Sequence, residues 1–172
     1  MYKRIAIIGA PGTGKTTLAK NLSKILNIPV THIDGIHHLP NWEIRDKAER
    51  DKIILEIANK NEWIIDGTYR ATLRQRLELA DLIIWLDFST SAQIRGILER
   101  YFKNINKEKE EIPGCKEKID KAFLSYVLKY NKEKRNIIVN NINGINENKI
   151  IILKTRKKLD RWLKDFERSL NG

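Results

Sequence analysis

Short apolar runs alternate along the chain with longer stretches in which apolar positions recur at helical spacing. The runs predict strands at residues 4–8, 29–33, 63–65, 82–86 and 149–153. The stretches between them predict helices at residues 15–26, 46–61, 72–79, 91–102, 116–136 and 157–170. Because strands alternate with helices, the pattern predicts a single α/β domain over residues 1–172, with a parallel sheet between layers of helices.

The first strand runs directly into Gly9-Ala-Pro-Gly-Thr-Gly-Lys15-Thr16, a complete G-x-x-x-x-G-K-[ST] phosphate loop. Its glycines let successive backbone N–H groups turn inward, and the positive helix N-terminus behind them favours a phosphate. We expect Lys15 to reach the β- and γ-phosphates of ATP, as a catalytic residue, and Thr16 to hold Mg²⁺. A glycine-rich turn that binds nothing is the alternative, and the Lys-Thr pair with these flanks disfavours it. The expected nucleotide-binding residues of the loop are Gly9, Pro11, Gly12, Thr13, Gly14, Lys15, Thr16 and Thr17.

Asp66 ends the third predicted strand and is the expected second metal residue. A carboxylate at such a strand end, beside a phosphate loop, can orient Mg²⁺ through water. Asp87 follows the fourth strand with the same local pattern, and for either residue a turn or a helix cap is the structural alternative. We favour Asp66 because Arg70 follows closely and adds an anion-binding cation, expected to contact the acceptor.

Asp34 is expected to end the second strand and to face the phosphoryl acceptor. In a kinase that phosphorylates a hydroxyl, this carboxylate could accept the proton, whereas a phosphate acceptor needs no base. An Asp-Gly turn is the structural alternative. Residues 36–61 are expected to form the acceptor-binding region, in which Trp42 could stack on a base or cover the core. Its histidines lack the ligand spacing of a zinc site, which favours a substrate-facing loop.

Residues 103–115 are polar, contain proline and glycine, and predict a mobile loop. Cations on the following helix could swing onto the transferring phosphoryl group when that loop closes. Lys132, Lys134 and Arg135 are the candidates, and Arg135 is the predicted catalytic one. For each of them a solvated basic face is the alternative.

Composition narrows the classes of protein further. The chain is 41% hydrophobic and 32% charged, as in a soluble globular protein, and its one cysteine excludes an intramolecular disulfide. With no membrane-length apolar stretch and no signal peptide, we expect a cytoplasmic protein without a membrane partner. A net charge of +11 could attract nucleic acid or anionic substrates. Solvated helix faces explain most of it, so DNA is the less favoured partner.

Several segments resemble the adenylate-kinase-like branch of P-loop kinases. Residues 63–70, Trp-Ile-Ile-Asp-Gly-Thr-Tyr-Arg, resemble its LDGFPR segment, in which the Asp lies near Mg²⁺ and the Arg binds the acceptor's phosphate. Residues 81–87 and 94–100 resemble the following strand and helix, which implies that Arg100 flanks the adenine of the donor. Residues 103–118 fall where that branch has its small lid. The implied fold is a P-loop NTPase sandwich with a five-stranded parallel sheet in the order 2-3-1-4-5.

A closer resemblance is to the bacterial DNA topology modulation proteins, which are themselves adenylate-kinase-like. It rests on Asp34 with a following Trp42-Glu43 loop, on Asp-Gly-Thr-Tyr after the third strand, and on Gly114-Cys115-Lys-Glu117. The chain departs from adenylate kinases at Thr68-Tyr69, where they have Phe-Pro, and only Arg45 is a candidate for their acceptor-binding arginine. Asp34 is also similar to the acid that holds a substrate hydroxyl in shikimate and gluconate kinases.

These observations predict a kinase that uses Mg-ATP to phosphorylate a nucleotide, a nucleoside or another small hydroxyl compound. A nucleotide-dependent DNA-binding or DNA-topology-modulating protein stays open as the alternative class. The absence of a recognisable DNA-reading motif disfavours that alternative.

Overall fold

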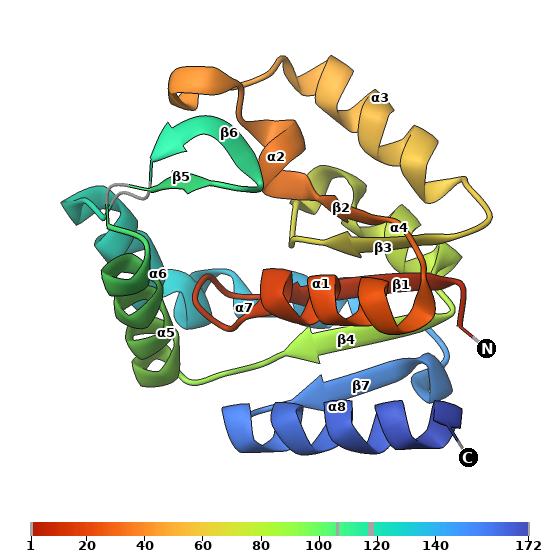
Figure 1. Ribbon diagram of the computed structural model, residues 1–172. Helices are drawn as coiled ribbons and strands as arrows, with labels where there is room; N and C mark the ends of the chain where they lie inside the picture. The colour runs from red at the N-terminus through yellow and green to blue at the C-terminus, as the bar shows by residue number, and fades with distance from the viewer. Residues whose placement is uncertain (1, 106, 117–118, 172) are drawn as a thin grey trace.

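The computed structural model describes residues 2–105, 107–116 and 119–171 (Figure 1). Its main sheet is parallel and has the order β2-β3-β1-β4-β7. The strands are β1 (Arg4–Gly9), β2 (Val30–His32), β3 (Trp63–Asp66), β4 (Leu82–Leu86) and β7 (Ile150–Leu153). Because β7 is the fifth predicted strand, the α/β class and the predicted order 2-3-1-4-5 are confirmed.

Helices cover both faces of the sheet. Figure 1 shows α1 (Lys15–Leu26) in front of it and α4 (Leu73–Leu79) and α7 (Arg135–Ile142) behind it. Side chains alternate across a strand, so Ile5 and Ile7 of β1 pack with α1 and α8 (Arg156–Asn171). Ala6 and Ile8 pack instead with α3 (Lys47–Ala58), α4 and α7. The apolar runs of the sequence are therefore strands buried on both faces.

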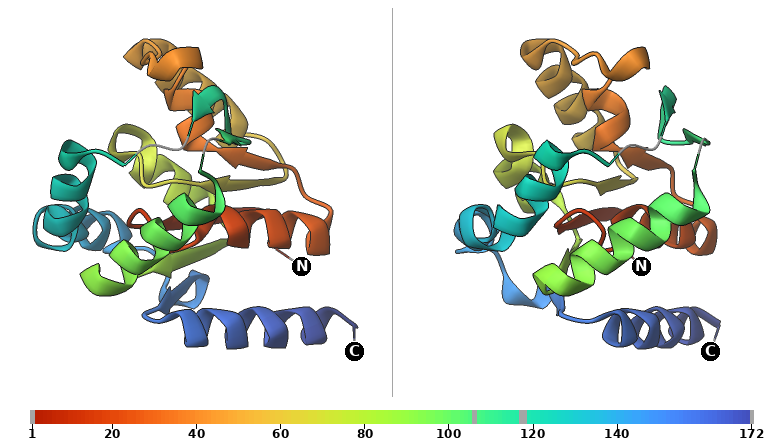
Figure 2. Two further views of the ribbon diagram at one scale, coloured as in Figure 1. Left: turned by 60° about the vertical axis from the view of Figure 1, so that its left-hand side comes forward. Right: turned by 90° about the vertical axis from the view of Figure 1, so that its left-hand side faces the viewer.

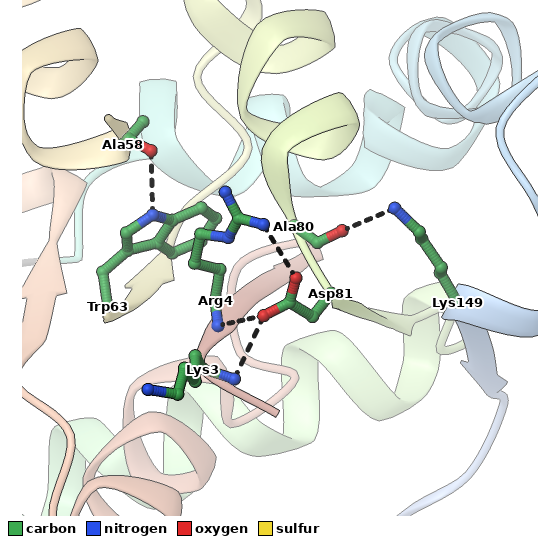
Figure 3. Close-up of polar contacts among 7 residues, drawn as sticks. All are labelled: Lys3, Arg4, Ala58, Trp63, Ala80, Asp81 and Lys149. Carbon is green, nitrogen blue, oxygen red and sulfur yellow. Dashed lines mark hydrogen bonds and ion pairs between the residues drawn. The ribbon is translucent and has the colours of Figure 1, made fainter. Parts of the chain in front are cut away.

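Asp81 connects the starts of β1 and β4 at the amino-terminal edge of the sheet. Its carboxylate accepts the backbone N–H groups of Lys3 and Arg4 at 3.1 and 2.9 Å, and the Arg4 guanidinium at 3.0 Å (Figure 3). Burial, the largest single influence, would raise the pKa of Asp81, but these hydrogen bonds together lower it. Nearby, the Lys149 ammonium donates to the carbonyl of Ala80 at 3.2 Å. These contacts fix the ends of β1, β4 and β7 at the edge opposite the carboxyl ends of the strands.

The structure corrects the predicted loop at residues 103–115. Its described part contains an antiparallel hairpin of β5 (Glu108–Lys109) and β6 (Ile112–Lys116). Ile112 and Cys115 are buried, since β6 packs on the 3₁₀ turn η1 (Pro40–Trp42). In the two views of Figure 2 the hairpin stands beside the segment that leads from β2 to α3. Residues 106, 117 and 118 of the expected lid stretch lie outside the described residues.

Two further boundaries differ from the predictions. The long helix predicted over residues 116–136 is divided into α6 (Lys121–Glu133) and α7 at Lys134, which is the C-cap residue of the first helix and the N-cap residue of the second. The second strand ends at His32, and Asp34 lies in the first turn of α2 (Ile33–His37). The remaining elements are α5 (Thr90–Lys103), η2 (Arg70–Thr72) and η3 (Glu147–Lys149). Within the described ranges, none of the helices combines the length and apolar character needed to cross a bilayer.

Candidate functional site

A cavity of about 1190 Å³ opens at the carboxyl-terminal edge of the sheet. The phosphate loop forms its floor, and the ends of β2 and β3, the second half of α5, the hairpin and the start of α6 form its walls. Ligands of open parallel sheets bind at this edge, because the helix N-termini and the loops after the strands converge there. We refer to this space as the central cavity.

The phosphate loop holds a backbone that only glycine accommodates. Gly12 has φ +75°, and a Cβ atom on it would lie 2.2 Å from the carbonyl oxygen of Gln93. Gly14 has φ +91° and begins α1 without any side-chain cap, and the first turn of α1 contains no acidic residue. The first N–H groups of α1 are therefore left for a ligand, and together with the helix dipole they favour phosphate oxygens.

Lys15 extends along this loop, and its ammonium donates to the carbonyl of Ala10 at 2.8 Å. Burial lowers the pKa of Lys15, and the nearby carboxylates of Asp34 and Asp66 oppose that shift. Thr13 differs from the other predicted residues of the loop, because its buried hydroxyl donates to Ala10 at 2.9 Å and it does not line the cavity. The predicted residues that do line the cavity are Gly9, Pro11, Gly12, Gly14, Lys15, Thr16 and Thr17.

Asp66 is buried at the end of β3 and borders the central cavity with Thr16. Its Oδ1 lies 2.8 Å from Nδ1 of His32, which sits on the neighbouring strand β2. Among the described residues, no group of three acidic, histidine or cysteine side chains could hold a metal by itself. A hydroxyl and one carboxylate fit Mg²⁺, which takes most of its ligands from phosphates and water.

The segment after β3 is tied to the phosphate loop and to a buried arginine. The Thr68 hydroxyl accepts the N–H of Gly9 at 2.9 Å and donates to its carbonyl at 3.0 Å. Arg76, which is fully buried, donates to the carbonyls of Gly67 and Tyr69 at 3.1 and 3.0 Å. Burial lowers the pKa of Arg76 to about 10, so it stays charged at neutral pH. The loop that carries Arg70 is thereby held in one conformation.

On the acceptor side the structure brings Asp34, Trp42 and Arg70 to the central cavity. Trp42 has φ +64°, a left-handed conformation that is strained for a bulky residue. Its backbone N–H donates to the Sγ of Cys115 at 3.2 Å, which ties this segment to β6. The side chain of Trp42 is half-buried, and the hairpin's Lys109 places its ammonium 5.2 Å from the ring centre.

Two histidines continue the wall formed by Trp42. The ring of His38 meets those of His37 and Trp42 edge-on, with centres 4.5 and 5.2 Å apart. Burial lowers the pKa of both histidines, and Arg50 lowers it further, so both are neutral at pH 7. Arg50 is itself buried, where it donates to Nδ1 of His37 and, at 2.8 Å, to the Tyr69 hydroxyl.

Two arginines line the part of the cavity that is expected to hold ATP, and only one of them was predicted from the sequence. Arg100 lines the central cavity, as expected for a residue near the adenine. Arg156 lines it too, and its guanidinium approaches Gly14 so closely that a Cβ there would lie 2.4 Å from Nη1. The signal was available, because Arg156 follows the fifth strand at the edge where ligands bind. The roles of Thr68 and Lys109, and the contact of His32 with Asp66, were not predicted, because they depend on contacts distant in sequence.

Besides Thr13, two predicted site residues, Arg135 and Arg45, do not line the central cavity. Arg135, the expected catalytic cation, forms a two-pronged pair with Asp87 at 2.9 and 2.8 Å and lies over the ring of Trp85. This pairing directs Nε and Nη2 of Arg135 to Asp87, and Asp87, the rival metal residue, does not line the cavity either. Arg45 donates to the carbonyl of Ile36 at 2.9 Å and pairs with Glu49. Lys132 and Lys134 are not among the residues that line the cavity.

Fold and cavity together define a P-loop nucleotide-binding protein. The family profile AAA_18, described as an AAA domain, matches residues 5–111, and the chain belongs to this family. Membership implies that the phosphate loop binds ATP.

The chain is similar to several curated proteins. It is 34% identical to a gluconokinase of Arabidopsis thaliana over 96 residues, which are 56% of this chain and 48% of that enzyme. It is 26% identical to a cytidylate kinase of Pyrobaculum islandicum over 136 residues, 70% of this chain and 73% of that enzyme. An archaeal Lon protease of Halobacterium salinarum matches at 28% identity over 85 residues. That match covers 49% of this chain and only 11% of the protease.

Solved structures share the fold over nearly the whole chain. A shikimate kinase from Acinetobacter baumannii in complex with shikimate superposes with a TM-score of 0.61 at 16% identity, over 98% of this chain and 93% of that one. A shikimate kinase from Bacteroides thetaiotaomicron gives a TM-score of 0.57 at 14% identity, over both chains in full. At such identities the likeness establishes the fold and leaves the substrate open.

Proposed function

We propose that the protein is a small-molecule kinase that transfers the γ-phosphoryl group of Mg-ATP to a hydroxyl group. The observation that carries the proposal is the presence of Asp34 in the same cavity as the phosphate loop, close enough to influence the pKa of Lys15. The named activities of the gluconokinase and the cytidylate kinase support phosphoryl transfer.

The donor is held by the phosphate loop. The N–H groups at the start of α1 and the ammonium of Lys15 bind the phosphates, while Arg100 and Arg156 border the remainder of the nucleotide. Thr16 and Asp66 would hold a magnesium ion, and His32 orients the Asp66 carboxylate. Bound magnesium would neutralise charge on the phosphates of the nucleotide.

The acceptor occupies the opposite end of the cavity. Asp34 orients its hydroxyl group and takes the proton as the oxygen attacks the γ-phosphorus. The hairpin and η1 shield this end from water, since they pack against each other with the side chains of Ile112 and Cys115 buried. Arg70 and Lys109 also line the cavity and could contact the acceptor.

A second candidate function is nucleotide-dependent DNA binding, which the resemblance to DNA topology modulation proteins implies. The net charge of +11 favours it. So does one face of α8, where a shallow groove is bordered by Arg156, Lys157, Arg161, Lys164 and Arg168, with Asp160 and Asp165 between them. Salt-dependent DNA binding without phosphoryl transfer to any small acceptor would support this candidate.

The proposed kinase activity is tested by an acceptor screen. The protein is incubated with Mg-ATP and each of a set of nucleosides, nucleoside monophosphates and sugar acids, and ADP release is followed. We expect one class to raise ADP release above the rate with water alone, and we expect Lys15→Ala to abolish the increase. Asp165→Asn, which alters an exposed surface pair, is the matched control and should keep it. No increase with any class would contradict the proposal.

A further inference from the structure

The two ends of the central cavity differ in charge. Among the described residues that line the donor end, the cations outnumber the one acid, Glu99; these cations are Lys15, Arg100, Lys103 and Arg156. This surplus matches a triphosphate, which carries several negative charges. The donor end is therefore built for an anion.

The acceptor end has no such surplus. Among the described residues, three acids, Asp34, Glu111 and Asp120, line it together with two cations, Arg70 and Lys109. Lys20 of α1 pairs with both Glu111, at 2.7 Å, and Glu110, at 2.5 Å, and does not itself line the cavity. Asp66 is not included, because the proposed metal accounts for its charge. A doubly charged phosphate would thus meet no net positive charge here, and the Asp34 carboxylate would repel it.

The arginines that could have changed this balance are engaged elsewhere. Arg45 is turned to the carbonyl of Ile36 and to Glu49, outside the cavity. Arg50 is buried against His37 and Tyr69. Both arise from the segment that approaches the acceptor, so the lack of surplus charge results from how these side chains are packed.

Rings dominate the surface of the acceptor end. The ring-bearing residues that line it are His37, His38, Trp42, Tyr69, Phe123 and Tyr126. Both histidines are neutral at pH 7, and burial together with the charge of Asp34 raises the pKa of Tyr126, so these rings carry no charge. Nδ1 of His38 is shielded from solvent and has no hydrogen-bond partner among the described residues. Such a surface favours a planar ring that also bears polar groups.

From this arrangement we infer that the acceptor is an uncharged alcohol that carries a planar ring, the chemistry of a nucleoside, and that Trp42 stacks on the ring. The inference rests on the proposed kinase function. The acceptor oxygen forms a bond to the γ-phosphorus while the bond from that phosphorus to the β–γ bridging oxygen breaks. The hydroxyl proton passes to Asp34, and the products are ADP and a phosphate monoester.

Phosphorus NMR tests the inference, because it separates a new phosphate monoester from a new phosphoanhydride. The full chain is incubated with Mg-ATP and, separately, with the four common ribonucleosides, with their 5′-monophosphates and with gluconate. We expect a monoester with at least one nucleoside and no anhydride from the monophosphates. An anhydride from a monophosphate, or faster transfer to gluconate than to every nucleoside, would overturn the inference while leaving the protein a kinase. Loss of ATP with no acceptor product in any mixture would overturn the proposed function as well.

A variant pair tests the ring contact. Trp42→Leu should raise the KM of the nucleoside about tenfold or more, the scale of base stacking on an aromatic side chain, and should leave the KM of ATP unchanged. Trp42→Phe keeps a ring and should retain most of the affinity. Phe102→Leu, which removes an exposed ring outside the cavity, is the matched control. Equal KM values for Trp42→Leu and the unaltered protein would contradict the stacking role.

Discussion

The hydroxyl of Thr68 lies between the two backbone groups of Gly9, at 2.9 Å from its nitrogen and 3.0 Å from its carbonyl oxygen. One side chain after β3 thus satisfies both backbone hydrogen-bonding groups of Gly9, the first residue of the phosphate loop. This contact connects the loop to the segment that carries Arg70.

Thr68→Val should lower the free energy of unfolding by about 1–3 kcal/mol, because the Gly9 N–H group loses its acceptor in a partly buried site. ATP binding should weaken as well, since the loop loses a fixed point. Urea denaturation and titration calorimetry measure the two effects. Thr68→Ser keeps the hydroxyl and should resemble the unaltered protein; equal losses in both variants would show that the hydroxyl is not responsible.

Arg76→Met should cost more than about 2 kcal/mol of stability. It leaves the carbonyls of Gly67 and Tyr69 without their donor in a buried site and frees the loop that carries Arg70. Arg95→Met is the matched control, because the Arg95 side chain is 83% exposed and its ion pair with Glu99 lies on the surface. Thermal denaturation of the two variants measures the difference. Similar midpoints for Arg76→Met and Arg95→Met would show that Arg76 does not hold the loop after β3.

Arg156→Gln should weaken ATP binding about tenfold or more, the scale of one lost hydrogen bond to a charged group. Arg161→Gln removes a cation from the next turn of the same helix, outside the central cavity, and should leave ATP binding unchanged. Calorimetric titration with ATP measures the Kd of both variants. An equal rise in the Kd would show that the positive charge of α8 as a whole, and not a contact made by Arg156, favours ATP binding.

The phosphate loop and the sheet could be predicted because their signals are local. The motif is contiguous, and strands buried on both faces appear as continuous apolar runs. The hairpin could not be predicted, since Ile112 and Cys115 are buried where β6 packs against α2 and η1, which are far away in the sequence. The pairing of Arg135 could not be predicted for the same reason. Its partner Asp87 lies 48 positions earlier in the chain, and no local pattern indicates that the two side chains meet.

Asp81→Asn should destabilise the protein by about 1–2 kcal/mol at pH 7, since the hydrogen bonds that the charged carboxylate accepts from Lys3 and Arg4 are weakened or lost. The folded-state pKa of Asp81 lies below its ordinary value of 3.8. The stabilisation is therefore present above pH 3.8 and is lost as the pH falls through the lower folded value. Urea denaturation at several pH values should show the gap between variant and unaltered protein narrowing below about pH 4. A gap that widens on acidification would contradict this reasoning.

In the proposed kinase reaction, one cavity holds ATP over Lys15 and an acceptor hydroxyl against Asp34. The most direct test of this arrangement is acceptor-dependent ADP release by Asp34→Asn, measured with the best acceptor of the unaltered protein, alongside ATP affinity by calorimetry. We predict that turnover falls about 10²-fold or more, the scale of general-base catalysis, while the Kd for ATP is unchanged. Unchanged turnover with the same acceptor would contradict the claim.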